Sequence, residues 1–223
     1  MLLLFVHGYF SGSSVGPNRL FCDTARLARD YDIASMRYDW RGMGNSTGHI
    51  SENDLQTVLG DLGFVIGLAR RKFPDCPLVL VAHSVGCAVA LSCFGNRTFS
   101  SPTALVLLSP GPFGIERMRF LCPGLLKSSR FVVRKGLTLN RLLLLDIARG
   151  PAYTNIEKTT APTLIIYCLD DKLCDRVRLE KFTSKHVNVV KFASGGHNFS
   201  AIEPMAQIPK LIVRFLRRYV HGG

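Results

Sequence analysis

Six short apolar runs recur along this chain of 223 residues, each separated from the next by a longer stretch of mixed or polar composition. They consist mostly of leucine, isoleucine and valine and span residues 2–6, 33–38, 78–82, 104–108, 163–167 and 187–192. Such runs, alternating with helical patterns, are typical of a mostly parallel sheet with helices on both faces. The sequence therefore predicts a single α/β domain with a sheet of about six strands.

Two long helices are predicted from apolar residues at helical spacing. In the first, these residues are Leu55, Val58, Leu59, Leu62, Val65, Ile66 and Ala69, and Ser51 and Asp54 precede them at the spacing of a capping box. In the second, Met205, Ile208, Ile212, Phe215, Leu216 and Tyr219 share one face, and Lys210, Arg214, Arg217 and Arg218 lie largely on the other. We expect this final helix to pack on the sheet through its apolar face.

Residues 111–158 interrupt the alternation, because nearly fifty residues separate two strands that a helix of about a dozen residues could join. We interpret this segment as an inserted lid within the single domain. It holds nine basic residues against three acidic ones. Two interpretations of its cations stay open: a solvated surface, or a border of the pocket entrance that attracts anionic substrates or an anionic lipid surface. The cations in question are Arg117, Arg119, Lys127, Arg130, Arg134 and Lys135.

The chain carries 28 Lys and Arg residues against 16 Asp and Glu residues, a net charge of +12 that favours anionic partners. The basic residues are not interleaved with aromatic residues in a recognisable nucleic-acid module, so no nucleic-acid partner is expected. The remaining anionic partners are a substrate or, at the periphery, a lipid surface. The sequence does not indicate the oligomeric state.

Seven cysteines are scattered along the chain, and none forms a Cys-x-x-Cys pair. We therefore expect neither a metal site nor a cofactor, and a reducing, cytoplasmic compartment. The apolar run at residues 2–6 is too short for the core of a signal peptide. No run approaches the roughly 18 apolar residues of a membrane-spanning helix.

An apolar strand at residues 78–82 leads into a turn at Ser84, and a helix of small and apolar residues from Cys87 to Phe94 follows. A nucleophile on a sharp strand-to-helix turn needs small residues on either side, and Ala82 and Gly86 meet that need. The N-terminal N–H groups of the following helix would stabilise negative charge that develops at the serine. This context makes Ser84 the candidate nucleophile.

The segment Ala82–Gly86 resembles the nucleophile elbow of the α/β-hydrolase superfamily, with alanine in place of the usual first glycine. Residues 3–9 resemble the family's His-Gly segment, whose loop supplies one N–H group of the oxyanion hole. The resemblance implies Tyr9, or in second place Phe10, as that donor and Val85 as the other. Phe10 and His83, the variable residue of the elbow, are also candidates for substrate contact.

Residues 37–48 are similar to a segment of lysophospholipase-like and monoacylglycerol-lipase-like members, where it is mostly structural. We expect Asp39 and Arg41 to brace a loop rather than touch substrate. Family members usually have two strands before the His-Gly strand, so the resemblance also implies a less protected sheet edge here.

The resemblance also implies the chain order Ser, Asp, His for a catalytic triad. Residues 189–199 resemble the Gly-His segment, which assigns the general base to His197. A strand from Thr163 ends near two carboxylates, and the family spacing favours Asp171 over Asp170 as the acid that orients the base. His7 is expected to brace the oxyanion loop.

The resemblance thus implies a serine hydrolase that cleaves a small acyl substrate, a carboxylic ester or thioester, through an acyl-enzyme. An aminopeptidase or an acyltransferase on the same scaffold stays open, as does a binding protein that keeps the fold without catalysis.

Overall fold

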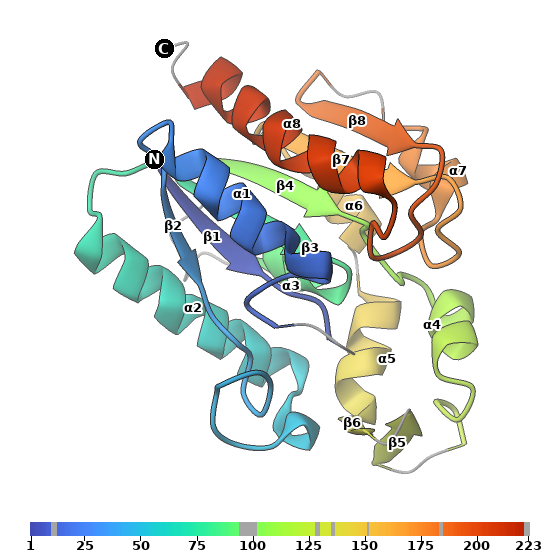
Figure 1. Cartoon of the computed structure of the whole chain (residues 1–223). Coiled ribbons are helices and arrows are strands. Elements are labelled where there is room, and N and C mark those ends of the chain that lie inside the picture. The colour runs from blue at the N-terminus through green and yellow to red at the C-terminus, as the bar shows by residue number, and fades with distance from the viewer. Residues whose placement is uncertain are drawn as a thin grey trace.

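The structure, a computed structural model, describes residues 1–9, 13–93, 102–127, 130–134, 137–150, 152–182 and 185–220. Its centre is one parallel sheet of six strands in the order β2-β1-β3-β4-β7-β8 (Figure 1). These strands are β1 (Leu2–Val6), β2 (Ala34–Arg37), β3 (Leu78–His83), β4 (Ala104–Leu108), β7 (Thr163–Cys168) and β8 (Val187–Phe192). The predicted α/β fold with about six strands is confirmed, and each strand lies within an apolar run or extends it by one residue.

Helices cover both faces of the sheet. The α-helices are α1 (Leu20–Arg29), α2 (Leu55–Lys72), α3 (Val85–Ser92), α4 (Ile115–Leu121), α5 (Arg141–Arg149), α6 (Ala152–Lys158), α7 (Arg176–Leu179) and α8 (Ile202–Val220), with short 3-10 turns η1 (Pro17–Arg19) and η2 (Ile50–Glu52). Helices α1 and α8 lie side by side on one face, and α2 and α3 pack on the other (Figure 1). Among the described residues, no helix is long and apolar enough to cross a membrane.

Two hydrophobic cores follow from the alternation of side chains along each strand. In β1, Leu3 and Phe5 point into the core beneath α1 and α8, whereas Leu2, Leu4 and Val6 point into the core beneath α2 and α3. The central strands are buried throughout. Because both faces are covered, these strands carry no polar alternation, which is why they appear as continuous apolar runs.

The segment 111–158 contains α4, the antiparallel pair β5 (Phe131–Arg134) and β6 (Leu137–Asn140), α5 and α6. Figure 1 shows α4, α5 and the hairpin beyond the carboxyl ends of the sheet strands, whereas α6 packs against α3. Their apolar residues, such as Met118, Leu139 and Leu144, are buried in the same core as α2 and α3. The segment is therefore a packed extension of that core, and its action as a lid stays a prediction.

The predicted capping box at the start of α2 is wrong. Ser51 lies inside η2, and Asn53, with φ −74° and ψ 97°, separates that turn from the helix. Asp54 is itself the N-cap, because its carboxylate accepts a hydrogen bond of 2.7 Å from the N–H of Thr57. An aspartate can cap a helix alone, so the Ser-x-x-Asp spacing carried no further information.

The register of the sheet decides which loops meet. Val6 lies beside Ala82, and Ala82 lies beside Leu107, so β1, β3 and β4 end at the same edge. The residues that follow these strands, together with those that follow β7 and β8, come together there.

Candidate active site

Ser84 lies on a strained turn between β3 and α3. Its φ of 56° and ψ of −127° fall outside the regions that residues with side chains normally adopt. A hydrogen bond to the neighbouring strand stabilises the turn, because the N–H of Ser84 donates to the carbonyl of Leu108 on β4 at 3.0 Å. Strain of this kind costs about 1–3 kcal/mol and is retained only where the surrounding structure enforces it.

Gly86 lets the first turn of α3 lie directly on β1. A Cβ atom at this position would lie 2.5 Å from each of the carbonyl oxygens of Val6 and His7. Real Cβ contacts are never this close, so any larger residue would push the helix away from the strand. This close contact is the physical reason for the small residue predicted at position 86.

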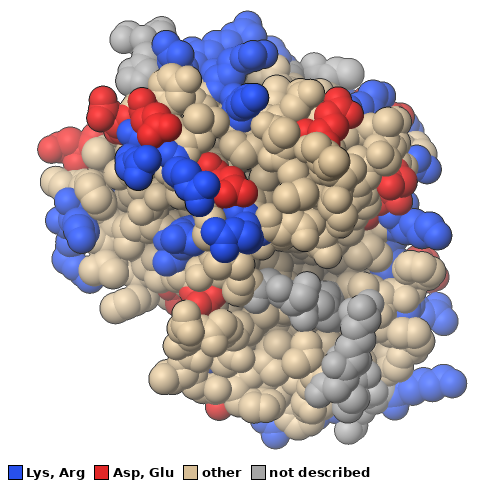
Figure 2. All heavy atoms as spheres, viewed as in Figure 1, with Lys and Arg blue, Asp and Glu red and all other residues tan. Residues whose placement is uncertain are grey.

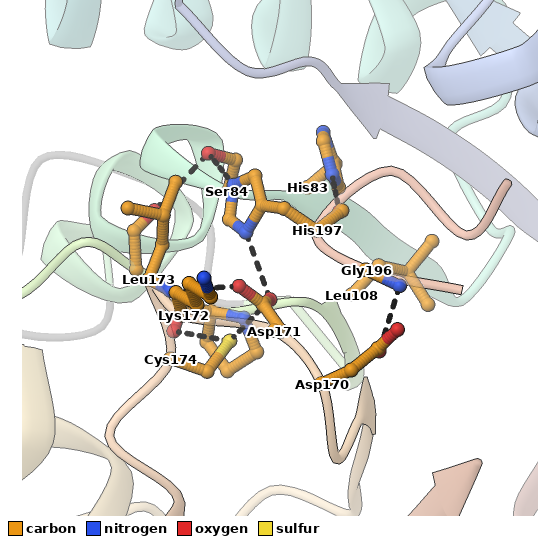
Figure 3. Close-up of polar contacts among 12 residues, drawn as sticks. His83, Ser84, Leu108, Asp170, Asp171, Lys172, Leu173, Cys174, Gly196 and His197 are labelled. Atoms are coloured by element: carbon orange, nitrogen blue, oxygen red, sulfur yellow. Dashed lines mark hydrogen bonds and ion pairs between the residues drawn. The ribbon is translucent and has the colours of Figure 1, made fainter. Parts of the chain in front are cut away.

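The side chains of Ser84, His197 and Asp171 form one continuous hydrogen-bonded row (Figure 3). The His197 Nδ1 atom lies 2.8 Å from Asp171 Oδ2, and the His197 Nε2 atom lies 2.7 Å from Ser84 Oγ. A carboxylate only accepts, so Nδ1 carries the proton and Nε2 is free to accept from the serine hydroxyl. The Gly111 carbonyl, 3.1 Å from Ser84 Oγ, competes for the same hydroxyl proton at a longer distance.

Asp171 is buried and held by three donors. The N–H of Leu173 donates to Oδ1 at 2.8 Å, and the Cys174 thiol donates to Oδ2 at 2.9 Å, beside the bond from His197 (Figure 3). Burial alone would raise the pKa of Asp171, but these hydrogen bonds and the charge of His197 together lower it to about 2. The carboxylate is therefore ionised at neutral pH, as an orienting group for a histidine requires.

Cys174 is a part of the site that the sequence did not indicate. Its side chain is buried, and burial, followed by the Asp171 charge, holds the pKa of the thiol well above its usual range. The group therefore stays protonated and can donate to the carboxylate. A single cysteine in a loop follows no periodicity, so sequence patterns gave no signal for this contact.

Asp170, the other candidate acid, points away from His197. Its carboxylate accepts hydrogen bonds from the N–H groups of Gly195 and Gly196, at 3.2 Å and 2.8 Å. It thus ties the turn after β7 to the loop that carries His197 (Figure 3). The two adjacent aspartates position the same histidine in different ways, one through its ring and one through its backbone.

The His83 side chain is buried against the loop that carries His197. Its Nε2 atom donates to the carbonyl of His197 at 3.0 Å. Burial, followed by the nearby charge of His197, lowers the pKa of His83 to about 3, so the ring is neutral. The structure gives His83 a bracing contact, and its predicted contact with substrate stays a prediction.

The loop after β1 passes close to Ser84. A Cβ atom on Gly8 would lie 3.1 Å from the Ser84 Cβ atom, so the backbone before Tyr9 passes very close to the nucleophile. Val85 is the first residue of α3, where helix N–H groups lack partners within the helix. Tyr9 is buried and its hydroxyl donates to the Ile50 carbonyl at 3.1 Å.

His7 links this loop to the next. Its Nε2 atom accepts from the N–H of Trp40 at 3.0 Å, so Nδ1 is the protonated nitrogen that donates to the carbonyl of Gly8 at 2.6 Å. Burial lowers the pKa of His7, which keeps this arrangement neutral. The contacts match the bracing role expected for His7. Phe10, the second oxyanion candidate, lies outside the described residues.

The contacts of Asp39 and Arg41 are those of loop-bracing residues. The Asp39 carboxylate accepts from the N–H groups of Ser14, at 2.5 Å, and Asn45, at 3.0 Å. Arg41 pairs with Asp61 on α2 at 2.9 Å. These contacts tie the loop after β2 to its neighbours and place neither side chain against Ser84.

One group of possible metal ligands occurs in the described part of the chain. The ligand atoms of Asp171, Cys174 and His197 lie within 4.8 Å of one another. Both neighbours donate to the same oxygen, Asp171 Oδ2, so the protons of Cys174 and His197 already occupy the space between the three atoms. The hydrogen bonds account for the arrangement.

The sequence matches the alpha/beta hydrolase family over residues 3–208, and the chain therefore belongs to this family. No curated protein matches the sequence. Among solved structures, the chain is similar to Est1E from Butyrivibrio proteoclasticus, determined with ferulic acid bound. That comparison has a TM-score of 0.80 and 18% identity and covers 99% of this chain and 89% of Est1E.

Two further structures show the same fold. The esterase domain of a Rhodothermus marinus protein matches with a TM-score of 0.70 and 18% identity, covering 98% of this chain and 87% of that one. Alpha/beta hydrolase domain-containing protein 10 from mouse matches with a TM-score of 0.71 and 14% identity, covering 97% and 90%. At such identities the likeness concerns the fold, and activity has to be argued from the site.

Proposed function

We propose that this protein is a serine hydrolase that cleaves carboxylic esters or thioesters through an acyl-enzyme intermediate. The observation that carries the proposal is the row of hydrogen bonds from Ser84 through His197 to Asp171, with bonds of 2.7 Å and 2.8 Å, on a strained strand-to-helix turn. The arrangement supplies a nucleophile, a base that can take its proton, and an acid that fixes the orientation of the base.

In the acylation step, Ser84 Oγ attacks the substrate carbonyl carbon while His197 Nε2 takes the hydroxyl proton. Asp171 stays ionised and stabilises the imidazolium that forms, since its pKa of about 2 is far below neutrality. The imidazolium then gives its proton to the leaving alcohol or thiol. A water molecule, activated by His197, attacks the acyl-serine and regenerates Ser84.

The developing oxyanion needs hydrogen-bond donors on the side of Ser84 away from His197. We assign the backbone N–H groups of Val85 and Tyr9 to this role. The start of α3 at Val85 and the close passage of Gly8 beside Ser84 support this assignment. Each such donor typically contributes about 10²–10³ in kcat.

A fluorophosphonate probe, which reacts with activated serines, tests the proposal against a binding protein that only keeps the fold. We expect labelling of the wild-type chain and none of Ser84→Ala. Turnover of p-nitrophenyl esters, acyl-CoAs and aminoacyl amides then separates an esterase or thioesterase from an aminopeptidase. Adding an acceptor alcohol to the ester assay shows whether acyl transfer competes with hydrolysis. Labelling that persists in Ser84→Ala, or faster cleavage of the amides than of the esters, would overturn the proposal.

A further inference from the structure

A groove between α1 and α8 gathers cations on the surface that the proposed chemistry does not use. It has a volume of about 700 Å³, within the range of small-molecule sites. Helix α8 lines it with Lys210, Val213, Arg214, Arg217 and Arg218, and α1 and the turn after it line it with Leu27 and Tyr31. We propose that this groove docks the protein on an anionic lipid surface by taking up the phosphate-bearing headgroup of a phospholipid.

Three of the cations of the groove, Lys210, Arg214 and Arg217, are available to an external anion. Among the described residues, no ion pair joins Lys210, Arg214 or Arg217 to a carboxylate, and no acidic residue lines the groove. Asp30, beside Tyr31 in the chain, is paired with Arg29 at 3.3 Å. Figure 2 shows basic side chains crowded over the C-terminal half of α8, at the top of the view.

The cations of segment 111–158 are engaged differently. Arg117 pairs with Asp175 at 3.5 Å and donates to the Lys172 carbonyl, and Arg119 pairs with Glu116 at 3.5 Å. The Arg130 guanidinium lies 5.0 Å from the centre of the Phe131 ring. Lys135 and the side chain of Arg134 lie outside what the structure describes. The contacts of Arg117 and Arg119 favour a structural role there, so the groove is the better candidate for the anionic partner.

The shape of the groove favours a phospholipid headgroup over nucleic acid. A strand of nucleic acid needs cations along its backbone and open aromatic faces on which bases stack. The aromatic residue of the groove, Tyr31, has the Arg217 guanidinium over its ring, 5.2 Å from the centroid. The aliphatic side chains of Leu27 and Val213 suit the glycerol region of a lipid, and the arginines suit its phosphate.

Docking at this groove would leave the candidate active site open. Helix α8 begins just after the His197 loop, at the carboxyl edge of the sheet, and runs back towards the opposite edge (Figure 1). Arg214 lies twelve residues after Ile202, about 18 Å further along the helix at 1.5 Å per residue. A lipid surface at the groove therefore contacts the end of α8 that is remote from Ser84.

The test is co-sedimentation of the whole chain with phosphatidylcholine vesicles, with and without phosphatidylserine. We expect binding only to the anionic vesicles. The double variant Arg214→Gln/Arg217→Gln should weaken it roughly 30-fold, because each cation near such a surface contributes about a factor of five. The control Arg71→Gln/Lys72→Gln removes the same charge from exposed positions at the end of α2 and should retain most of the binding.

Tyr31→Ala tests the groove itself, because it removes the aromatic ring that lines the groove without changing the charge, and we expect binding several-fold weaker. Hydrolysis of a neutral short ester should be unchanged in all these variants. Absence of vesicle binding, equal losses in both double variants, or unchanged binding by Tyr31→Ala would overturn the proposal. So would an oligonucleotide that binds while the vesicles do not.

Discussion

Two neighbouring carboxylates with different partners determine how His197 is held. Asp171 is bonded to the imidazole ring, whereas Asp170 is bonded to the N–H groups of Gly195 and Gly196. The sequence located the turn and the histidine, and the family spacing favoured Asp171. Residue types alone could not separate the two, because both aspartates follow the same strand and only the direction of each side chain distinguishes them.

The Asp171→Asn variant should lower kcat by roughly 10⁴, because an amide no longer holds the protonated Nδ1 tautomer of His197. Asp170→Asn keeps one acceptor oxygen for the N–H groups of Gly195 and Gly196 and should lower kcat far less. Steady-state kinetics with a p-nitrophenyl ester measures both. A larger loss in Asp170→Asn would show that the two roles are reversed.

Cys174→Ala should lower kcat/KM about tenfold, because Asp171 loses a donor that helps to fix its carboxylate. Cys174→Ser restores a donor of similar size and should recover most of the activity. The ratio of kcat/KM between the serine and alanine variants is the decisive quantity. If Cys174 only fills space, both small replacements should have the same kcat/KM. Equal kcat/KM values for the alanine and serine variants would remove Cys174 from the positioning of Asp171.

His83 should make the folded state sensitive to acid. Its pKa is about 3 in the folded chain and about 6.5 when unfolded, so between these values the unfolded state alone binds the proton. Stability therefore falls as pH falls, by about 1.4 kcal/mol for each pH unit below about 6.5. His83→Gln keeps a donor for the His197 carbonyl and should reduce this slope by that amount in urea unfolding. An unchanged slope would contradict the neutral, buried state of His83.

At the scale of elements, α3 and its contact with β1 decide whether the nucleophile turn can form. The apolar run and the small residues around Ser84 sufficed to predict this unit. The hairpin of β5 and β6 was not predicted, because short elements in a long insertion depend on tertiary contacts rather than on their own periodicity. Helix α1 was not predicted either, although its buried residues Leu20, Phe21, Thr24 and Ala28 recur at helical spacing. The predicted capping box was wrong because the Ser-x-x-Asp pattern fits a helix that starts after Ser51 as well as one that starts after Asp54.

Gly86→Ala should destabilise the fold by about 2–3 kcal/mol, because the new methyl group meets the Val6 and His7 carbonyl oxygens. The matched control is Gly60→Ala in α2, where a Cβ atom would meet nothing within 4 Å. That change should stabilise the chain by about 0.5–1 kcal/mol, since alanine favours a helix. Urea unfolding measures both, and similar stability of the two variants would argue against the close contact between α3 and β1.

At the scale of the whole molecule, the sheet brings distant loops to one edge. Residues after β1, β3, β4, β7 and β8 all contribute to the surroundings of Ser84. The opposite end of α8 carries the cations of the groove, so the proposed chemistry and the proposed docking occupy separate regions. The sequence predicted the amphipathic character of α8, but the groove needs α1 as its second wall, which only the fold supplies.

The most direct test of the proposed function is the intact mass of the protein, measured after rapid acid quenching during turnover of a p-nitrophenyl ester. We expect a mass gain of one acyl group, mapped by peptide analysis to Ser84, and none in Ser84→Ala, which should unfold at nearly the same urea concentration as the wild type. Turnover by Ser84→Ala at more than a few per cent of the wild-type rate, or an acyl group on another residue, would contradict it.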